Sequence, residues 1–409
     1  MIPIVISKAR QFIREIIYAP VEKLVRRVVP ARKQAAWLHR FQSWKRALTP
    51  QINEQIRQAL ADHPHPRAVI VFTPSLDWER QLFQRPQQLA LALAKRGALV
   101  FYTQLRPLEG GQALKQIAEG LYLGAIPLEC FSQFDSFFAY TLTWNRKYLL
   151  KLIDPCVLYD YVDELSTFAG DPRQMAADHK TLLETAAVVT TTANTLLEEV
   201  QPSRPDALLV PNGTDFAHFN RRAEPVTPPH ELLDRQKPVI GYYGALASWF
   251  DYPLMLELAR QRADLDFVLI GPAHDDSLEE SGLAALENVV YLGPKPYAEL
   301  PAYLACFDVA ILPFRVNQIT QSTSPIKLFE YFAGGKPVVS TPLREVMQYP
   351  EVLIGADAGA FSRQVDQALS VRGDAGFIRR LQETARQNTW EARAESILGA
   401  IERFHKHPA

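Results

Sequence analysis

Apolar and polar positions follow two different periods along this chain. In residues 1–60 the apolar residues recur at steps of three, four or seven, which predicts amphipathic helices. Pro20 divides this run, because proline can begin a helix but cannot continue one. From residue 67 onward, short apolar runs of strand length alternate with helical patterns. Such alternation predicts parallel β-sheets with helices on both faces.

The alternation of strands and helices occurs twice. Its first pass occupies residues 66–225 and its second residues 238–390, and the Pro-rich polar segment 226–237 between them is typical of a linker. The last residues, 391–409, are predicted to form a helix that packs back toward the first domain. We therefore predict an α/β protein with two doubly wound, Rossmann-like domains and a helical extension at residues 1–65. Ligands bind such sheets at the carboxyl ends of their strands, which places a site in the cleft between the domains.

Charge is distributed unevenly along the chain. Residues 1–50 contain eleven Lys or Arg and two Glu, a net charge of +9, whereas the whole chain has a net charge of −1. A basic amphipathic helix can lie on an anionic membrane surface, which is our prediction for residues 1–60. The alternative is an extension packed on the main domain. The rest of the chain shows no basic stripe typical of nucleic-acid binding.

Two further patterns limit the class of protein. No apolar run approaches the roughly 20 residues that span a bilayer. The three cysteines lie far apart and form no CxxC pair, which fits a protein of the reducing cytosol. HExxH, Cys/His clusters and Walker loops do not occur, so no metal site is predicted. The segment GYYGAL departs from the GxGxxG pattern of dinucleotide oxidoreductases.

The segment SPIKLFEYFAGGKPVVST, residues 324–341, predicts a helix with charges inside its apolar body. Ser324 suits the N-cap position and Pro325 the first helical position. A helix that starts after a strand directs its free N–H groups into the cleft, where they form an anion site. Lys327 lies in the first turn, and Glu330 follows one turn deeper, where its carboxylate suits the paired hydroxyls of a ribose. Phosphate and ribose together describe a nucleotide; the alternative is a surface Lys327–Glu330 pair on an ordinary helix.

Two carboxylates, Asp160 and Asp163, lie at the end of the strand predicted in CVLYDYVDEL, residues 156–165. The carboxyl end of this strand faces the cleft, where a base can deprotonate a hydroxyl within hydrogen-bond reach. Because the two residues are three apart, they need not both point inward. The alternative role for these carboxylates is a helix cap or a structural link to the neighbouring loop.

Three more candidates, Asp77, Trp78 and Arg85, follow the first predicted strand. We assign them to acceptor binding. Trp78 suits stacking on a sugar face, and its alternative role is that of an aromatic side chain at the edge of the core. Arg85 suits contact with an anionic acceptor, and its alternative role is to position the loop.

The segment 324–341 resembles the donor-binding signature of GT-B glycosyltransferases, especially the bacterial group related to family 4, the glycosyl transferases group 1. The resemblance extends over most of residues 67–390. It includes, in the family's order, the blocks VLYDYVDELSTF, VVTTTANTLLEE, VPNGTDFAHF, FVLIGP and NVVYLGPKPYAELPAYLACFDVAILPF. Among such enzymes, the chain is most similar to transferases of bacterial cell-surface polysaccharides, including the teichuronic-acid type.

The resemblance implies specific roles for residues of the second domain. Glu330 would bind the ribose of a nucleotide sugar, and Ser324, Pro325 and Lys327 would lie at the diphosphate. Gly241 and Gly244 would let the backbone approach the donor closely. A UDP-sugar is favoured over a GDP-sugar as donor, and no cofactor is expected.

The chain departs from the family pattern at two places. The second glutamate of the family, eight residues before the ribose-binding one, is Ser322 here. The Arg and Lys that often follow the first strand of the second domain are missing from GALASWFDYP. Positive charge for the diphosphate must therefore come from Lys327, with Arg315 or Lys295 as further candidates. The retaining stereochemistry of the family is accordingly left open.

These features predict a hexosyltransferase-type enzyme that moves a sugar from a nucleotide-diphosphate sugar to a lipid-linked saccharide in surface polysaccharide synthesis. Asp160, Asp163 and Lys327 are the candidate catalytic residues. We expect a cytoplasmic protein, peripheral on the inner face of the cytoplasmic membrane. The alternatives are a nucleotide-sugar epimerase or hydrolase on the same fold, and a non-catalytic nucleotide-sugar-binding partner of a polysaccharide complex.

Overall fold

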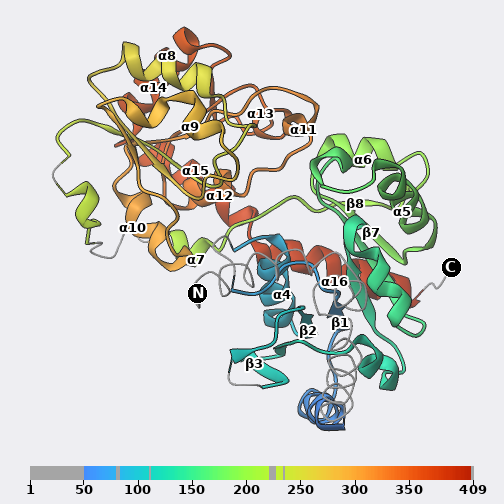
Figure 1. The fold of residues 1–409 in the computed structure, drawn as a ribbon. Coiled ribbons are helices and arrows are strands. Elements are labelled where there is room, and N and C mark those ends of the chain that lie inside the picture. The colour runs from blue at the N-terminus through green and yellow to red at the C-terminus, as the bar shows by residue number, and fades with distance from the viewer. Residues whose placement is uncertain (1–49, 80–82, 110–111, 221–226, 234, 407–409) are drawn as a thin grey trace, which may run out of the picture.

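The protein folds as two sheet-containing domains joined side by side (Figure 1). The computed structural model describes residues 50–79, 83–109, 112–220, 227–233 and 235–406. The helices predicted within residues 1–49 lie outside this described part, as do residues 221–226 of the segment that follows Asn220.

The N-terminal domain is built on an eight-stranded sheet with the order β3-β4-β2-β1-β5-β6-β7-β8. Neighbouring strands pair in parallel except β3 and β4, which are antiparallel. The strands are β1 (Val69–Phe72), β2 (Leu99–Thr103), β3 (Leu114–Ala118), β4 (Leu121–Gly124), β5 (Phe138–Thr141), β6 (Cys156–Tyr161), β7 (Val188–Thr191) and β8 (Leu208–Leu209). The helices of this domain are α4 (Arg85–Lys95), α5 (Pro172–Thr185) and α6 (Asn194–Val200), with 3₁₀ segments η2 (Leu128–Gln133), η3 (Thr143–Lys151) and η4 (Leu165–Thr167).

The C-terminal domain has a six-stranded parallel sheet with the order β11-β10-β9-β12-β13-β14. Its strands are β9 (Val239–Tyr243), β10 (Asp266–Ile270), β11 (Val289–Tyr291), β12 (Val309–Leu312), β13 (Val338–Ser340) and β14 (Leu353–Ile354). The strand order reverses between β9 and β12, and such a switch point is where doubly wound sheets bind ligands.

Helices cover this second sheet and continue beyond it. They are α7 (Phe216–Phe219), α8 (Tyr252–Gln261), α9 (Ser277–Ser281), α10 (Leu300–Ala305), α11 (Gln318–Gln321), α12 (Ile326–Ala333), α13 (Arg344–Met347), α14 (Ala358–Val371), α15 (Ala375–Gln387) and α16 (Trp390–Lys406). The 3₁₀ segments are η5 (His230–Leu232), η6 (Leu283–Ala285) and η7 (Tyr297–Glu299). Two doubly wound domains with helices on their faces confirm the predicted fold class.

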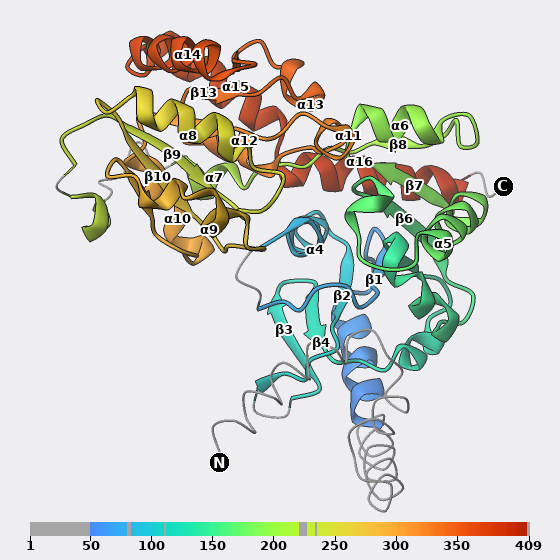
Figure 2. The same ribbon diagram turned by 45° about the horizontal axis from the view of Figure 1, so that its top comes forward.

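Helix α16 leaves the C-terminal domain and lies along α4 of the N-terminal domain (Figure 2). Trp390, Ala394 and Ile397 on α16 share one apolar cluster with Leu89 and Leu93 on α4. The last helix of the chain therefore contributes to the core of the first domain.

The end of the N-terminal extension also packs on the first domain. Residues 50–62 form a helix whose Ile52, Ile56 and Ala59 are buried at helical spacing. They share an apolar cluster with Phe101 and Phe131 of the sheet and its connections. The helix at residues 50–62 therefore packs on the first domain, as the alternative to membrane binding predicted. The preceding residues, for which we predict membrane binding, lie outside the described part of the chain.

The two domains are joined by a polar contact that we call the interdomain latch: Asn194 and Glu198 of α6 with Arg344 and Glu345 of α13. The carboxylate of Glu345 accepts hydrogen bonds from the Asn194 backbone N–H (2.8 Å) and side-chain amide (3.1 Å). Burial raises the pKa of Glu345, and the hydrogen bonds from Asn194 lower it. Arg344 bonds both oxygens of Glu198, at 2.9 and 2.5 Å. A residue of the second domain thus caps a helix of the first.

Replacing Glu345 by alanine is expected to favour separated domains by about 1 kcal/mol, because α6 loses the carboxylate at its first N–H. Small-angle scattering without ligand should then show a larger radius of gyration than in the wild type. The control Glu198→Ala removes a solvent-exposed partner and should leave the radius nearly unchanged. An unchanged radius for Glu345→Ala would show that the latch does not hold the domains together.

Candidate functional site

The start of helix α12 lies at the junction of the two domains, which we call the cleft, and has no side-chain cap. Its N-cap residue is Pro325 rather than the predicted Ser324. The Ser324 hydroxyl instead accepts a hydrogen bond from the Asn212 backbone N–H (3.2 Å), and the Ser324 carbonyl accepts one from the Asn212 side chain (2.6 Å). The first N–H groups of α12 are consequently available to an anion.

Lys327 in the first turn of α12 is a cation without an ion-pair partner among the described residues. Burial lowers its pKa, while the carboxylates of Glu330 and Asp163 raise it. Its side chain lies against Gly244, which follows β9 with φ of 148°. A Cβ atom on Gly244 would stand 2.5 Å from Lys327 Cε, so a larger residue would displace the lysine. The ammonium group is therefore held at the carboxyl end of β9, beside the uncapped helix start.

Glu330, one turn further along α12, is only 4% exposed. Burial raises its pKa to about 7, and Lys327 opposes that rise. The hydroxyl of Tyr243 faces this carboxyl, yet it is buried without a hydrogen bond of standard geometry. The alternative of a surface Lys327–Glu330 pair is wrong, because Glu330 is buried and Lys327 makes no ion pair with any described residue.

Asp160 and Arg85 form a buried ion pair across the first domain. The carboxylate of Asp160 accepts hydrogen bonds from Arg85 Nε (2.7 Å) and Nη2 (2.9 Å), from the Tyr140 hydroxyl (2.5 Å) and from the Thr190 hydroxyl (2.7 Å). Arg85 Nη1 also donates to the Asn212 side chain at 3.2 Å. Because these hydrogen bonds occupy both side chains, Asp160 is not available to act as a base, and Arg85 is not available to bind an acceptor substrate. The structural alternatives fit both residues.

Asp163, three residues after Asp160, is partly exposed and hydrogen-bonds no described residue. Burial raises its pKa to about 7, Arg85 and Lys327 lower it, and Asp160 raises it further. A carboxyl group that titrates near neutral pH and lies in a cleft is suited to proton transfer. Of the two predicted carboxylates, Asp163 is therefore the one available for chemistry.

Asn212 connects the parts of the site, a role that sequence reasoning missed. It bonds Arg85 of the first domain and Ser324 before α12, as described above. Its carbonyl also accepts from Nε and Nη2 of Arg393 on α16, both at 3.3 Å. The block VPNGTDFAHF, which contains Asn212, entered the sequence analysis only through the family resemblance and gave no sign of these three distant partners.

The two acceptor candidates after β1 lie at the edge of the aromatic core. The Trp78 ring meets the rings of Phe83 and Tyr102 edge-on, at centroid distances of 5.3 and 5.1 Å. The backbone carbonyl of Asp77 accepts a hydrogen bond from Gln87 at 3.3 Å. Trp78 is partly buried by these contacts, and the Asp77 carboxylate forms no hydrogen bond with a described residue.

Of the remaining residues predicted to bind the donor, some are available for a ligand and others already contact protein groups. Arg315 is exposed just after β12 and forms no ion pair with a described residue. Lys295 is bound to Glu231 at 2.6 Å and is not available for a diphosphate. A Cβ on Gly241 would stand 2.2 Å from the Phe307 ring, so packing rather than donor approach requires that glycine. Ser322 is buried and donates to the Gln318 carbonyl, so its hydroxyl does not replace the family's second glutamate.

The C-terminal domain, which contributes α12 to the site, is similar to a known protein family. Residues 237–370, which include α12, match the family described as Glycosyl transferases group 1. A protein named as a teichuronic acid biosynthesis glycosyltransferase, TuaH of Bacillus subtilis (strain 168), is 28% identical over 228 residues. The match covers 53% of this chain and 57% of that relative, so it spans little more than half of the relative's length.

Two solved structures share the fold over most of the chain. Sucrose-phosphate synthase from Thermosynechococcus elongatus has a TM-score of 0.60 and 17% identity, covering 83% of this chain and 99% of its own. Anabaena Alr3699/HepE in complex with UDP and glucose has a TM-score of 0.58 and 15% identity, covering 82% and 99%. The predicted likeness to GT-B glycosyltransferases related to family 4 is confirmed in the fold and in the C-terminal domain.

Proposed function

We propose that the protein is a glycosyltransferase that binds a nucleotide-diphosphate sugar at the start of α12 and transfers the sugar to an acceptor hydroxyl. One observation carries this proposal. An uncapped helix start, a cation without an ion pair at Lys327 and a buried carboxyl at Glu330 meet a free carboxyl, Asp163, from the opposite domain. The match of residues 237–370 to glycosyl transferases group 1 supports it.

In this proposal the diphosphate lies at the first N–H groups of α12 and at Lys327. Partial positive charge at the helix start and the full charge of the lysine both favour an anion there. The ribose hydroxyls donate hydrogen bonds to Glu330, one turn deeper on the same helix. A uridine nucleotide is our preferred donor, supported by the structural neighbour that holds UDP and glucose.

Transfer forms a bond between the acceptor oxygen and the anomeric carbon and breaks the bond from that carbon to the diphosphate oxygen. The acceptor proton passes to Asp163, which is free to receive it. Lys327 and the start of α12 stabilise the negative charge that develops on the departing diphosphate, an effect worth about 10²–10³ in rate per well-placed donor. Joining of the domains at the latch would exclude water from the donor.

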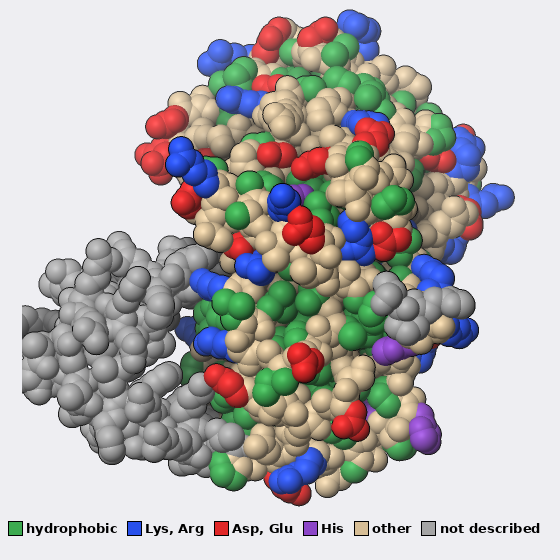
Figure 3. All heavy atoms as spheres, turned by 90° about the vertical axis from the view of Figure 1, so that its right-hand side faces the viewer, with side chains coloured by type: hydrophobic (Ala, Val, Ile, Leu, Met, Phe, Trp, Pro, Cys, Tyr) green, Lys and Arg blue, Asp and Glu red, His purple; other side chains and the backbone are tan. Residues whose placement is uncertain are grey.

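The proposed acceptor is a lipid-linked saccharide of a bacterial surface polysaccharide. The name of the Bacillus subtilis relative, which refers to teichuronic acid biosynthesis, supports the polysaccharide part of this proposal. The basic residues that precede the packed helix at residues 50–62 would hold the protein at the inner face of the cytoplasmic membrane. None of the described helices combines the length and the apolar character that a membrane span requires. On the face shown in Figure 3, Lys and Arg alternate with Asp and Glu, without the basic stripe that a nucleic acid would need.

Replacing Glu330 by alanine is expected to weaken nucleotide binding about tenfold or more, about 1.4 kcal/mol, because the ribose loses its acceptor. Calorimetric titration with UDP, GDP and ADP measures this, and UDP should bind the wild type most tightly. The control Glu383→Ala changes an exposed carboxylate on α15 and should bind UDP as the wild type does. Equal UDP affinity in Glu330→Ala and the wild type would contradict the assigned donor site.

A binding protein without turnover is the second candidate, and Ser322 favours it. Its hydroxyl is committed to the Gln318 carbonyl, so one sugar-contacting carboxylate of the family has no counterpart there. Incubation with UDP-sugars and saccharide acceptors separates the possibilities. Transfer supports the proposal, release of free sugar without acceptor indicates a hydrolase, and binding without either product indicates the non-catalytic role.

A further inference from the structure

In the described part of the chain, the backbone passes between the two domains twice. The first passage lies between Val210, in the apolar cluster of the N-terminal domain, and Phe219, in that of the C-terminal domain. The second lies between Ala385, in the cluster of the C-terminal domain, and Trp390, in that of the N-terminal domain. A rotation of one domain against the other has to be absorbed in these short segments. We call the two passages together the hinge.

The two passages of the hinge are bonded directly to each other. Thr214 donates its backbone N–H to the Asn388 carbonyl at 3.0 Å, and its own carbonyl accepts from the Trp390 backbone N–H at 3.2 Å. The segments therefore pair as a short parallel bridge. Gly213 makes this approach possible, because a Cβ atom there would stand 2.9 Å from the backbone of Thr389. The hinge is thus one paired element rather than two independent linkers.

Asn212 joins the hinge to the start of α12. Its backbone N–H and its side-chain amide donate to the hydroxyl and the carbonyl of Ser324, at 3.2 and 2.6 Å. Ser324 directly precedes Pro325, the N-cap residue of α12, and is only 5% exposed. Water therefore has little access to replace these two bonds. The orientation of the α12 start is tied to the hinge through Asn212.

Two arginines hold Asn212 on its other side. Arg85 Nη1 donates to Asn212 Oδ1 and to the Pro211 carbonyl, both at 3.2 Å. Nε and Nη2 of Arg393 donate to the Asn212 carbonyl, and its guanidinium carbon lies 6.0 Å from the centre of the Phe329 ring on α12. Burial lowers the pKa of Arg393 to about 10, and the like charge of Arg85 also lowers it. Asn212 therefore lies between two guanidinium groups.

These contacts connect the two halves of the proposed site. The carboxyl of Asp163 lies in the electrostatic field of Arg85, which Asn212 contacts, and of Lys327, which follows Ser324 on the chain. Transfer needs reacting atoms about 3–3.5 Å apart, and a misplacement of about 1 Å can lower the rate about 100-fold.

We propose that Asn212 is a positioning residue for sugar transfer, which holds the start of α12, and with it the donor diphosphate, in a fixed orientation to Asp163. Its effect on turnover rests on the proposed function. Its effect on the arrangement of the domains does not, because the bonds of Asn212 form without a nucleotide.

Asn212→Asp tests this proposal without leaving a cavity. The carboxylate cannot donate to the Ser324 carbonyl, but it is attracted by Arg85 and Arg393, so Tm should stay close to that of the wild type. We expect kcat to fall about tenfold or more, while the affinity for UDP in calorimetric titration changes less than about threefold, because the donor binds but is misplaced. Ser324→Ala removes only the hydroxyl acceptor and should lower kcat less than Asn212→Asp does.

Asn288→Asp is the matched control. The Asn288 side-chain amide also donates to backbone carbonyls, at 3.0, 3.0 and 3.3 Å, but all of them lie within the C-terminal domain: Ala259, Arg262 and Leu265. This change should lower Tm, because the carbonyls lose their donor, and it should leave kcat as in the wild type. An unchanged kcat in Asn212→Asp would overturn the proposal, as would a joint loss of kcat, Tm and UDP affinity.

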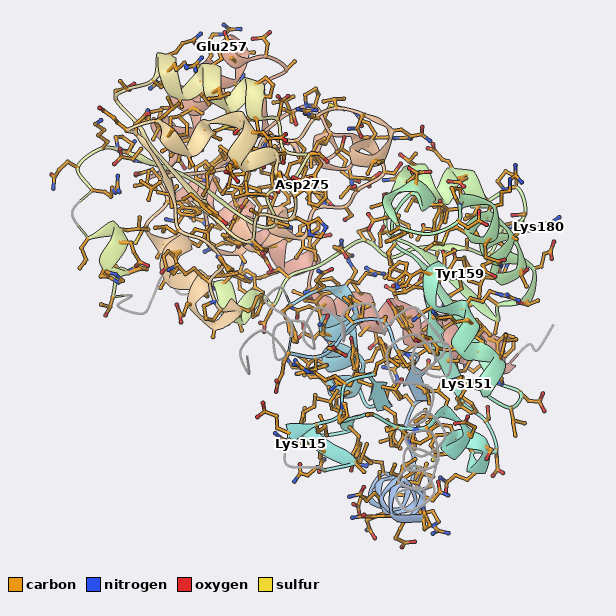
Figure 4. All side chains as sticks on the ribbon, viewed as in Figure 1. Lys115, Lys151, Tyr159, Lys180, Glu257 and Asp275 are labelled. Carbon is orange, nitrogen blue, oxygen red and sulfur yellow. The ribbon has the colours of Figure 1, made fainter. Side chains whose placement is uncertain are left out.

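A distance measurement tests the positioning role without any nucleotide. Spin labels are attached at Lys180→Cys on α5 and Glu257→Cys on α8, exposed positions at the far ends of the two domains (Figure 4). The partly exposed Cys156 and Cys306 are replaced by serine in every sample. The labels should show a narrow distance distribution in the wild type and a broader one in Asn212→Asp, since a small rotation at the hinge is amplified at these ends.

The two readouts allow the two proposals to fail separately. Equal distance distributions in Asn212→Asp and the wild type contradict the positioning role, whatever the kinetics show. If the wild type neither binds UDP nor transfers sugar, the proposed function fails. The distance distribution then decides by itself whether Asn212 fixes the arrangement of the domains.

Discussion

Replacing Asp163 by asparagine is expected to lower kcat for sugar transfer by about 10²–10⁴-fold, the usual contribution of a general base. Asp163 follows β6 and hydrogen-bonds no described residue, unlike Asp160, whose oxygens are occupied by Arg85, Tyr140 and Thr190. It also lies within the electrostatic field of Lys327, from the other side of the cleft. Asparagine preserves the size of the side chain and removes only its capacity to take a proton.

The pH dependence of the wild type should report the same group. Burial raises the pKa of Asp163 to about 7, and a base acts in its ionised form. We therefore expect kcat to fall about tenfold per pH unit below about pH 7 and to level off above it. The pKa of Glu330 is also raised to about 7, but its protonation should affect donor binding and so KM. In the Asp163→Asn variant, kcat should no longer fall below about pH 7, whereas the pH dependence of KM in this range should remain.

A stability measurement separates this role from a structural one. Because the folded protein favours the protonated form of Asp163, the unfolded chain ionises first as pH rises above the ordinary pKa of 3.8, and stability falls until about pH 7. Asparagine cannot ionise, so the variant at about pH 8 should have a Tm equal to or above that of the wild type. Loss of Tm together with activity would indicate a structural role for Asp163.

The anomeric configuration of the product is a further test of Asp163 as the catalytic base. Direct displacement assisted by a base inverts the anomeric configuration, which nuclear magnetic resonance of the product can determine. Unchanged kcat in Asp163→Asn would remove this carboxylate from the mechanism. Retention of configuration together with unchanged kcat would fit a transfer that needs no base from the protein.

The second large effect is expected on stability, from Asp160→Asn. This change leaves the buried guanidinium of Arg85 facing a neutral amide, and breaking a buried ion pair from one side typically costs about 3–5 kcal/mol. Arg85 and Asp160 have side-chain exposures of 5% and 0%, so water cannot replace the lost partner. Urea unfolding of the variant and the wild type, compared at equal slope, measures the difference.

Asp264→Asn is the matched control for Asp160→Asn. Asp264 pairs with Arg262 at 2.8 Å, but its side chain is 62% exposed, so the change should cost at most about 1 kcal/mol. The paired change Arg85→Met with Asp160→Leu should recover much of the stability lost in Asp160→Asn, because it removes both buried charges. A loss of less than about 1 kcal/mol in Asp160→Asn would show that the ion pair does not support the domain.

Local patterns in the sequence were sufficient for the fold and for part of the site. The alternation of apolar runs with helical periods predicted two doubly wound sheets, because strand and helix periods depend on near neighbours in the chain. The segment 324–341 likewise predicted a charged helix at the cleft, and Lys327 and Glu330 lie on it in the structure. Each predicted strand or helix, like the segment 324–341, lies within fewer than twenty residues. Over such short stretches the spacing of apolar and polar side chains is enough to predict the element.

Contacts between distant residues decided the rest. Sequence spacing could not tell Asp160 from Asp163, because Asp160 is occupied by Arg85, 75 residues away, and by Tyr140 and Thr190, 20 and 30 residues away. Ser324 looked like a helix cap until Asn212, 112 residues earlier, took its hydroxyl. A side chain bonds whichever partner the folded chain brings within about 3 Å, and burial then sets its charge. Neither the bonding partner of a side chain nor its degree of burial is defined before the tertiary structure forms.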